Sequence, residues 1–154
     1  GTSQVSTAGT SIDFTGIPSW AKRVTVMFNG VSTNGTSNYL LQLGTANGVE
    51  NTNYISSSGA LITSSYGAGS STAGFLLTGT GPEAAGLYSG LLIVASMTGN
   101  IWALSGNLGS ASNSRTFMNA GSKSLSATLD RIRITTANGT DTFDAGSINI
   151  LYEG

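Results

Sequence analysis

The chain contains no cysteine and no histidine among its 154 residues. Without cysteine it can form no disulfide framework, no thiolate zinc site and no thiol nucleophile. Without histidine, every catalytic mechanism that uses an imidazole is excluded. The sequence therefore predicts a protein that is not an enzyme and that has no cofactor and no metal site.

Charged residues are also scarce, at 8% of the chain against a usual share of about 25%. Six basic and seven acidic residues leave a net charge of −1, which is unlike a basic nucleic-acid-binding surface. The longest wholly apolar run, residues 91–95, is far shorter than the roughly 20 residues of a membrane-spanning helix. We therefore expect neither nucleic-acid binding nor membrane insertion, and little charge repulsion to oppose self-association.

Small polar residues take the place of the missing charges. Glycine, serine, threonine and asparagine together account for half of the sequence. Disorder usually requires a high net charge, which this chain does not have. We therefore expect one globular domain over residues 11–154, preceded by a polar linker or incoming strand at residues 1–10.

Apolar residues follow a period of two rather than 3.6, which places alternate side chains on one face of a pleated strand. This alternation occurs in residues 12–14, 24–28, 39–43, 132–134 and 148–152. Asn-Gly pairs, which tolerate the positive φ angles of tight hairpins, occur at Asn29, Asn34, Asn47 and Asn138. The pattern predicts an all-β, antiparallel fold, either a sandwich or a barrel, and we expect a jelly-roll-like β-sandwich.

Other segments carry weaker signals. The apolar run 91–95 predicts a strand covered on both faces, either in the centre of the core or at a subunit interface, with residues 100–104 as its hairpin partner. The two Thr-Ala-Asn-Gly strings, at residues 45–48 and 136–139, predict two similar hairpins. A helical turn is expected at Pro82, and residues 56–59 and 63–74 are expected to be exposed loops.

Two blocks near the ends of the chain resemble bacteriophage tail fibre proteins. The first is residues 13–26, DFTGIPSWAKRVTV, continued by residues 28–37, FNGVSTNGTS. The second is residues 143–153, FDAGSINILYE, which is similar to the closing strand of the same domains. The middle of the chain, residues 50–90, matches only in its Gly, Ser and Tyr content.

The resemblance implies the distal receptor-binding domain of a phage tail fibre, a homotrimeric tip that recognises a bacterial surface polysaccharide or outer-membrane receptor. Residues 1–10 would then come from an upstream fibre region, and the fibre would assemble in the host cytoplasm and act outside the cell on the virion. One alternative is a non-catalytic carbohydrate-binding or trimerisation module attached to a tailspike depolymerase. A second alternative is a structural decoration with no ligand.

Short motifs for catalysis or cation binding have simpler explanations. Ser19 and Lys22 match the S-x-x-K spacing, but they precede a strand rather than starting a helix, and the accompanying S-D-N and K-T-G motifs are missing. Asp141 and Asp144 lie close enough in the sequence for a cation site. Aspartates in turns more commonly accept hydrogen bonds from backbone N–H groups, and we expect that role here.

Sugar recognition uses aromatic rings for stacking and amides or guanidinium groups for hydrogen bonds. Phe14, Trp20, Phe28 and Phe143 lie beside strand patterns and are expected in the core. Trp102 is ambiguous between core and surface, and Arg131 and Arg133 share one strand face, where ion pairs with nearby carboxylates are the main alternative to ligand binding. The candidate receptor-binding residues are Asn51, Asn53, Tyr54, Tyr66, Trp102, Arg131 and Arg133.

Overall fold

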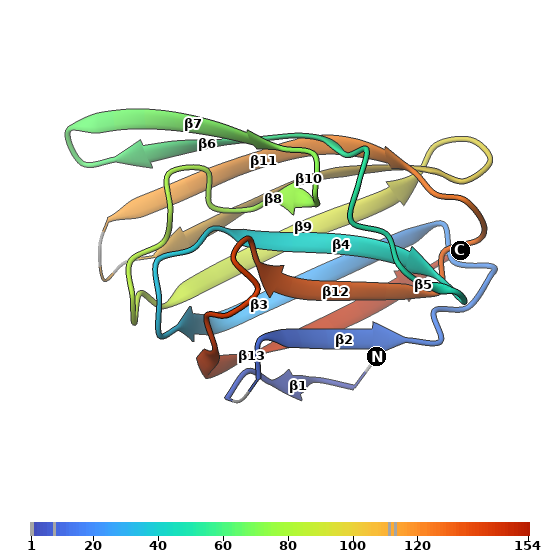
Figure 1. Ribbon diagram of the computed structural model, residues 1–154, viewed down its shortest axis with the longest axis horizontal. Helices are drawn as coiled ribbons and strands as arrows, with labels where there is room; N and C mark the ends of the chain where they lie inside the picture. Colours follow the sequence, from blue (N-terminus) through green and yellow to red (C-terminus); the bar gives the residue numbers. More distant parts are fainter. Residues whose placement is uncertain (1, 8, 111, 113) are drawn as a thin grey trace.

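The computed structural model describes residues 2–7, 9–110, 112 and 114–154, and its strands form two antiparallel sheets (Figure 1). The eight-stranded sheet has the spatial order β1 (Gln4–Val5), β13 (Phe143–Glu153), β3 (Arg23–Thr33), β9 (Tyr88–Ser96), β10 (Ile101–Ser110), β11 (Arg115–Ser124), β6 (Ile55–Ile62) and β7 (Ser65–Ser71). The five-stranded sheet has the order β2 (Ser11–Thr15), β12 (Arg131–Thr136), β4 (Tyr39–Thr45) and β5 (Gly48–Val49), with β8 (Phe75–Leu76) also paired to β4. No helix occurs among the described residues, so the predicted all-β, antiparallel class is confirmed.

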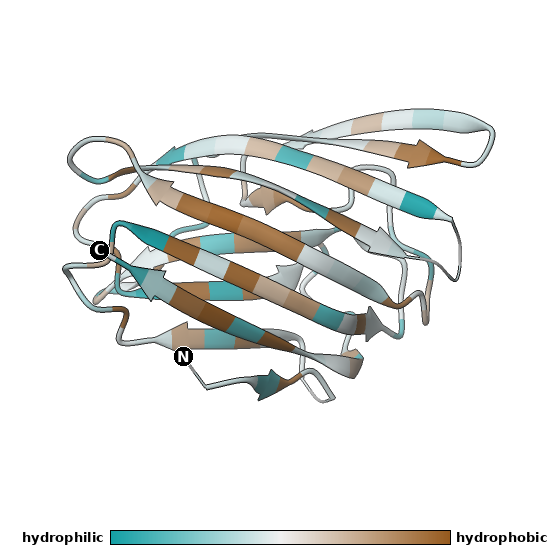
Figure 2. Cartoon of the chain, turned by 180° about the vertical axis from the view of Figure 1, so that it is seen from behind, coloured by the Kyte–Doolittle hydropathy of each residue, from teal (hydrophilic) through white to brown (hydrophobic). Residues whose placement is uncertain are grey.

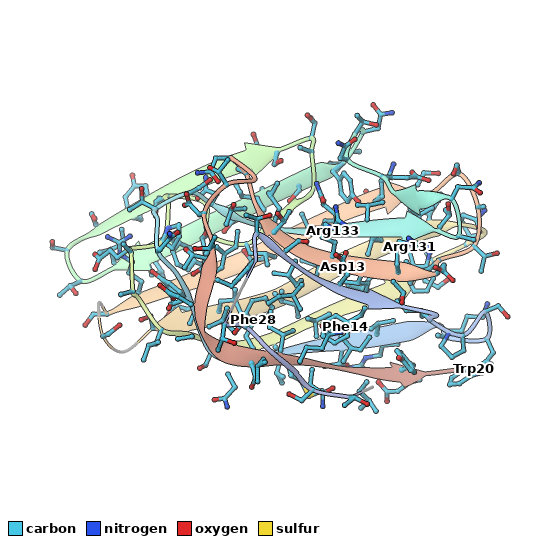
Figure 3. The ribbon with its side chains drawn as sticks, turned by 60° about the horizontal axis from the view of Figure 1, so that its bottom comes forward. Asp13, Phe14, Trp20, Phe28, Arg131 and Arg133 are labelled. Atoms are coloured by element: carbon cyan, nitrogen blue, oxygen red, sulfur yellow. The ribbon has the colours of Figure 1, made fainter. Side chains whose placement is uncertain are left out.

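The two sheets face each other across one hydrophobic core. Phe14 on β2 and Phe28 on β3 are both buried in it (Figure 3), as are Ile132 on β12 and Ile150 on β13. These residues occupy alternate positions of their strands, as the period-two pattern predicts. Aromatic edge-to-face contacts add geometric specificity to the core, for example between Tyr39 and Tyr88, whose ring centroids are 5.7 Å apart.

The Asn-Gly pairs have several different roles. The pair at Asn47 connects β4 to β5, a hairpin as predicted. The pair at Asn138 follows β12, which pairs with β2 and β4 and not with β13, so the second predicted hairpin is wrong. The pair at Asn29 lies inside β3 at a register shift, and that at Asn34 leads from one sheet to the other. The glycines of the pairs at Asn29, Asn47 and Asn138 have a positive φ, whereas Gly35 does not. A positive φ serves bulges and other turns as well as hairpins, so the dipeptide alone does not identify a hairpin.

The central Ser/Gly-rich region forms a β-hairpin, so the prediction that residues 56–59 and 63–74 are exposed loops is wrong. Residues 56–59 belong to β6, and most of residues 63–74 form β7, which pairs with β6 over seven residue pairs. Backbone hydrogen bonding to neighbouring strands compensates for the low strand propensity of serine and glycine. The expected helical turn at Pro82 is a non-helical turn, in which Gly86 N–H donates to Glu83 O at 3.0 Å and Ala85 has a φ of 58°.

Three further expectations are decided by the fold. The run 91–95 lies on β9 in the middle of the eight-stranded sheet and pairs with β10 as predicted, but among the described residues full burial is limited to the face with Leu92 and Val94. Trp20 is 57% exposed at one end of the molecule (Figure 3), so its predicted core position is wrong. Gln4 and Val5 of the predicted polar segment pair with β13 at the sheet edge, whereas Gly1 and Ala8 lie outside the described residues.

Candidate functional site

The outward face of the five-stranded sheet carries polar side chains in cross-strand rows. Strand β12 alternates between inward-facing isoleucines and the outward-facing Arg131, Arg133 and Thr135. Arg133 pairs in register with Asp13 on β2 and with Gln42 on β4. Directly opposed residues share a face of the sheet, so residues from three distant parts of the sequence form one row.

Asp13 holds the guanidinium of Arg133 in a fixed orientation. Arg133 Nε donates to Asp13 Oδ1 at 2.7 Å, and Arg133 Nη2 donates to Asp13 Oδ2 at 3.1 Å. The hydrogen bonds to Asp13 raise the pKa of Arg133 above its ordinary value. This two-pronged pairing positions the donor group on the surface and neutralises its charge.

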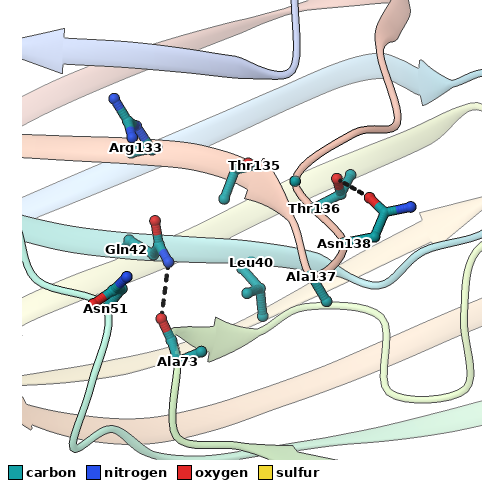
Figure 4. A pocket seen from close by; sticks show the side chains of 10 residues that line it. Leu40, Gln42, Asn51, Ala73, Arg133, Thr135, Thr136, Ala137 and Asn138 are labelled. Carbon is teal, nitrogen blue, oxygen red and sulfur yellow. Dashed lines mark hydrogen bonds between the residues drawn. The ribbon is translucent and has the colours of Figure 1, made fainter.

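A loop segment before β8 closes one side of this surface. Gln42 Nε2 donates to Ala73 O at 2.9 Å, which ties the segment to β4 (Figure 4). The segment passes so close to β4 that a Cβ on Gly74 would lie 3.0 Å from Gln42 Cγ and 3.2 Å from Leu40 Cβ. Glycine at position 74 therefore permits the close approach that buries Leu40 as an apolar floor.

These elements enclose a shallow groove of about 280 Å³, seen at close range in Figure 4. Its lining combines amides, hydroxyls, one guanidinium and small apolar groups, contributed by Leu40, Gln42, Asn51, Ala73, Arg133, Thr135, Thr136, Ala137, Asn138 and Gly139. The groove offers several hydrogen-bond donors and acceptors on rigid strands. Such a lining suits a polyhydroxylated ligand.

A network of hydrogen bonds fixes the end of the groove after β12. Asn138 Oδ1 accepts from Thr136 Oγ1 at 2.9 Å and from the backbone N–H of Thr140 at 3.0 Å. Asp141 accepts from Ser37 N–H at 2.9 Å and from Asn138 Nδ2 at 2.6 Å. The predicted turn-stabilising role of Asp141 is confirmed.

Asp144 makes a separate contact, because its carboxylate accepts a hydrogen bond from Ser32 Oγ. Among the described residues no group of three or more His, Cys, Asp or Glu side chains is placed to hold a metal ion. Within the same part of the chain, no helix is long and apolar enough to cross a bilayer. Ser19 precedes β3 in a turn where Ala21 N–H donates to Pro18 O at 2.9 Å, as the sequence indicated.

The structure brings two of the seven candidate binding residues, Asn51 and Arg133, together in the groove. Arg131 lies on the same face, where its Nη2 is 3.0 Å from Asp130 Oδ2. Both arginines thus form the ion pairs considered as the alternative to ligand binding. Asn53 is exposed in the turn before β6, with a φ of 58°.

The aromatic candidates lie elsewhere. Tyr54, a candidate binding residue from the sequence, is only 2% exposed and packs in the hydrophobic core, so its ring is not available to a ligand. Its hydroxyl accepts from Leu43 N–H at 2.7 Å and donates to Glu50 O at 2.8 Å. Trp102 is a core residue, and Tyr66 is 87% exposed but on β7 of the other sheet rather than in a loop.

Sequence reasoning missed Leu40, Gln42, Thr135 and Asn138. One signal was present for Gln42, which is a lone amide inside the apolar segment 39–43. An amide there must lie next to a polar partner or a surface hollow, because burying it alone is costly. Leu40 and Thr135 join the site through strand register, and Asn138 joins it through the turn that follows β12.

Comparisons with known proteins identify no family. No family model matches the chain, and no curated protein matches it. A solved structure of a Congerin II double mutant is similar over 93% of this chain and 99% of its own, with 8% sequence identity and a TM-score of 0.35. At that level the likeness carries no argument about the ligand or activity of this chain.

Proposed function

We propose that this chain is the receptor-binding tip of a phage tail fibre and that its groove binds a glycan on the bacterial surface. The groove chemistry carries the proposal. Gln42, Asn51, Thr135 and Arg133 present both donors and acceptors within one hollow of about 280 Å³. Sugar hydroxyls act in both directions, so a mixed amide and hydroxyl lining suits them.

Rigidity supports the same assignment. The bonds from Arg133 to Asp13 and from Gln42 to Ala73 fix two of the polar groups before any ligand arrives. Pre-fixed side chains lose little conformational entropy on binding. The ion pair also leaves the groove without excess charge at this point, which favours a neutral saccharide over a strongly anionic one.

The resemblance of residues 13–26, 28–37 and 143–153 to tail fibre proteins supports the biological setting. In that setting the domain is a jelly-roll-like β-sandwich in a homotrimer on the virion, and it attaches the particle to the host without catalysis. Three copies per fibre would compensate for a weak single site through avidity.

Binding of the labelled protein to an array of bacterial surface polysaccharides tests the function. We expect at least one glycan to be bound. The double substitution Asn51→Ala and Thr135→Ala should then weaken binding at least tenfold, since two lost hydrogen bonds are worth roughly 2 kcal/mol.

The matched control replaces Asn47 and Thr128 by alanine in a different hollow near the β4–β5 turn. This control should bind as the wild-type protein does. Absence of binding to any glycan, or equal losses in both double variants, would contradict the proposal.

A further inference from the structure

The outward face of the eight-stranded sheet has almost no charge. Strand register aligns its outward residues in four rows that cross the sheet, one of which passes from Ala68 on β7 through Met118 and Leu91 to Asn149 on β13. We call the surface made by these four rows the uncharged face. Tyr66 belongs to the first of the four rows, and Ala95 belongs to the last. None of them contains Asp, Glu, Lys or Arg until the last row ends at the corner pair Arg23 and Glu153, which are 3.4 Å apart.

Large apolar side chains lie open on this face. Leu91 is 55% exposed and Met118 is 49% exposed, and Leu61 and Leu151 are about as open. Figure 2 views the molecule from this side, and the brown of apolar residues runs along most of β9. Leu92 and Val94 are buried, whereas on the outward side Leu91 is exposed and Ile93 is half-buried.

The contrast with the other sheet shows that this composition is specific to one face. The outward face of the five-stranded sheet carries Asp13, Arg131 and Arg133, all in ion pairs. A sheet face that stays in water usually carries charged and polar side chains. Monomeric proteins also rarely expose an apolar patch of more than a few hundred Å².

The dimensions of the uncharged face match those of a stable interface. Seven strands about 4.8 Å apart span about 29 Å, and four rows about 6.8 Å apart span about 20 Å. The product is roughly 600 Å², which is the lower end of the area, about 600–1,000 Å², that each partner buries in a specific protein–protein interface.

We propose that the uncharged face is the surface through which copies of this chain associate. A face with no charge offers nothing to attract a charged partner, whereas it can pack against itself without leaving a charge unpaired. Small residues between the large ones leave hollows into which the large side chains of another copy can fit. At Gly59 the nearest atom to an added Cβ would be Met118 Cε at 3.9 Å, so the methionine lies beside an open position.

The net charge of −1 adds little repulsion between copies. A dimer would bury the whole face against one partner, and the predicted homotrimer would divide it between two. Both arrangements use Leu91, which lies near the centre of the face.

Sedimentation velocity on the wild-type protein and on Leu91→Lys and Met118→Lys tests the inference. Both side chains are open in the single chain, so both variants should keep the wild-type circular dichroism and melting temperature at low protein concentration. The wild-type protein should sediment at a multiple of 15.5 kDa. Each lysine should weaken association at least tenfold, because it would bury an unpaired charge at the contact.

The control is Trp20→Lys, which makes the same kind of change at a residue that is 57% exposed but lies outside the uncharged face. It should leave the mass unchanged. A wild-type monomer at about 100 μM would overturn the proposal, because even a weak interface is populated there. Association of both lysine variants at wild-type strength, or loss of association in the Trp20 control, would also overturn it.

Discussion

Replacing Tyr54 by phenylalanine should destabilise the fold, although it removes a single oxygen atom. The hydroxyl accepts from Leu43 N–H at 2.7 Å and donates to Glu50 O at 2.8 Å, and the side chain is only 2% exposed. Phenylalanine leaves the buried N–H of Leu43 and the partly buried carbonyl of Glu50 without this partner. An unsatisfied buried polar group costs about 1–3 kcal/mol, so we expect a loss of about 2 kcal/mol in the free energy of unfolding.

The size of this effect can be measured by thermal and urea unfolding, followed by circular dichroism. For a chain of this length a loss of about 2 kcal/mol lowers the melting temperature by about 4–8 °C. Tyr54→Ala should cost more, about 3–5 kcal/mol, because it also removes the edge-to-face contact with Phe75 at 5.0 Å between ring centroids.

Tyr66→Phe is the matched control, since the same atom is removed from a side chain that is 87% exposed. It should change the free energy of unfolding by less than about 0.5 kcal/mol. If Tyr54→Phe is as stable as the wild-type protein, the hydroxyl does not connect β4 to the loop before β6, and the reasoning fails.

Acid should weaken the fold through Glu50. Burial raises the pKa of Glu50, but hydrogen bonds from Lys123 and Ser126 outweigh burial and lower this pKa below 4.5. The ionised Glu50 carboxylate therefore stabilises the fold above pH 4.5, and this stabilisation is lost as the pH falls through the folded-state pKa. The urea concentration at the midpoint of unfolding should therefore fall as the pH is lowered below 4.5, and Glu50→Gln should make this fall smaller. An equal fall in the variant would contradict the assignment. Gly74→Val should lower the free energy of unfolding by about 1–3 kcal/mol by overpacking the groove floor, whereas Gly109→Ala, which has room for a Cβ, should lower it much less. Tyr66→Ala should leave the melting temperature nearly unchanged, and its binding to host cells tests whether that exposed ring contacts a receptor.

The strands with strong alternation could be predicted because their pattern records which side faces the core. Ile132 and Ile134 are buried and Arg131 and Arg133 are not, as a period of two requires. The β6–β7 hairpin could not be predicted in this way. Its residues include SSSGAL and SYGAGSS, in which neither face is strongly apolar, and the strands exist because β11 and each other supply their backbone hydrogen bonds.

The groove was predictable only in part for a related reason. Arg133 and Asn51 were recognised as candidates from residue type, but their neighbours in space depend on register between strands that are far apart in the sequence. Asp13, Gln42 and Arg133 are direct neighbours across three strands, yet more than 25 residues separate each from the next in the chain. A shift of one residue in either pairing would place Gln42 or Asp13 on the opposite face and remove the row.

The two proposed surfaces lie on opposite sides of the molecule, because each is the outward face of a different sheet. If copies associate through the uncharged face, that face turns inward in every copy, and the groove with Arg133 and Asn51 then turns outward in every copy. A shallow polar groove binds weakly on its own, since it buries little apolar area and must displace water from each polar group. Several grooves held at fixed spacing raise the effective concentration of the second and third contacts without any new interaction. The two assignments therefore reinforce each other physically, and Leu91→Lys, which touches no groove residue, should lower adhesion to a glycan-coated surface while leaving the affinity for a monovalent sugar unchanged.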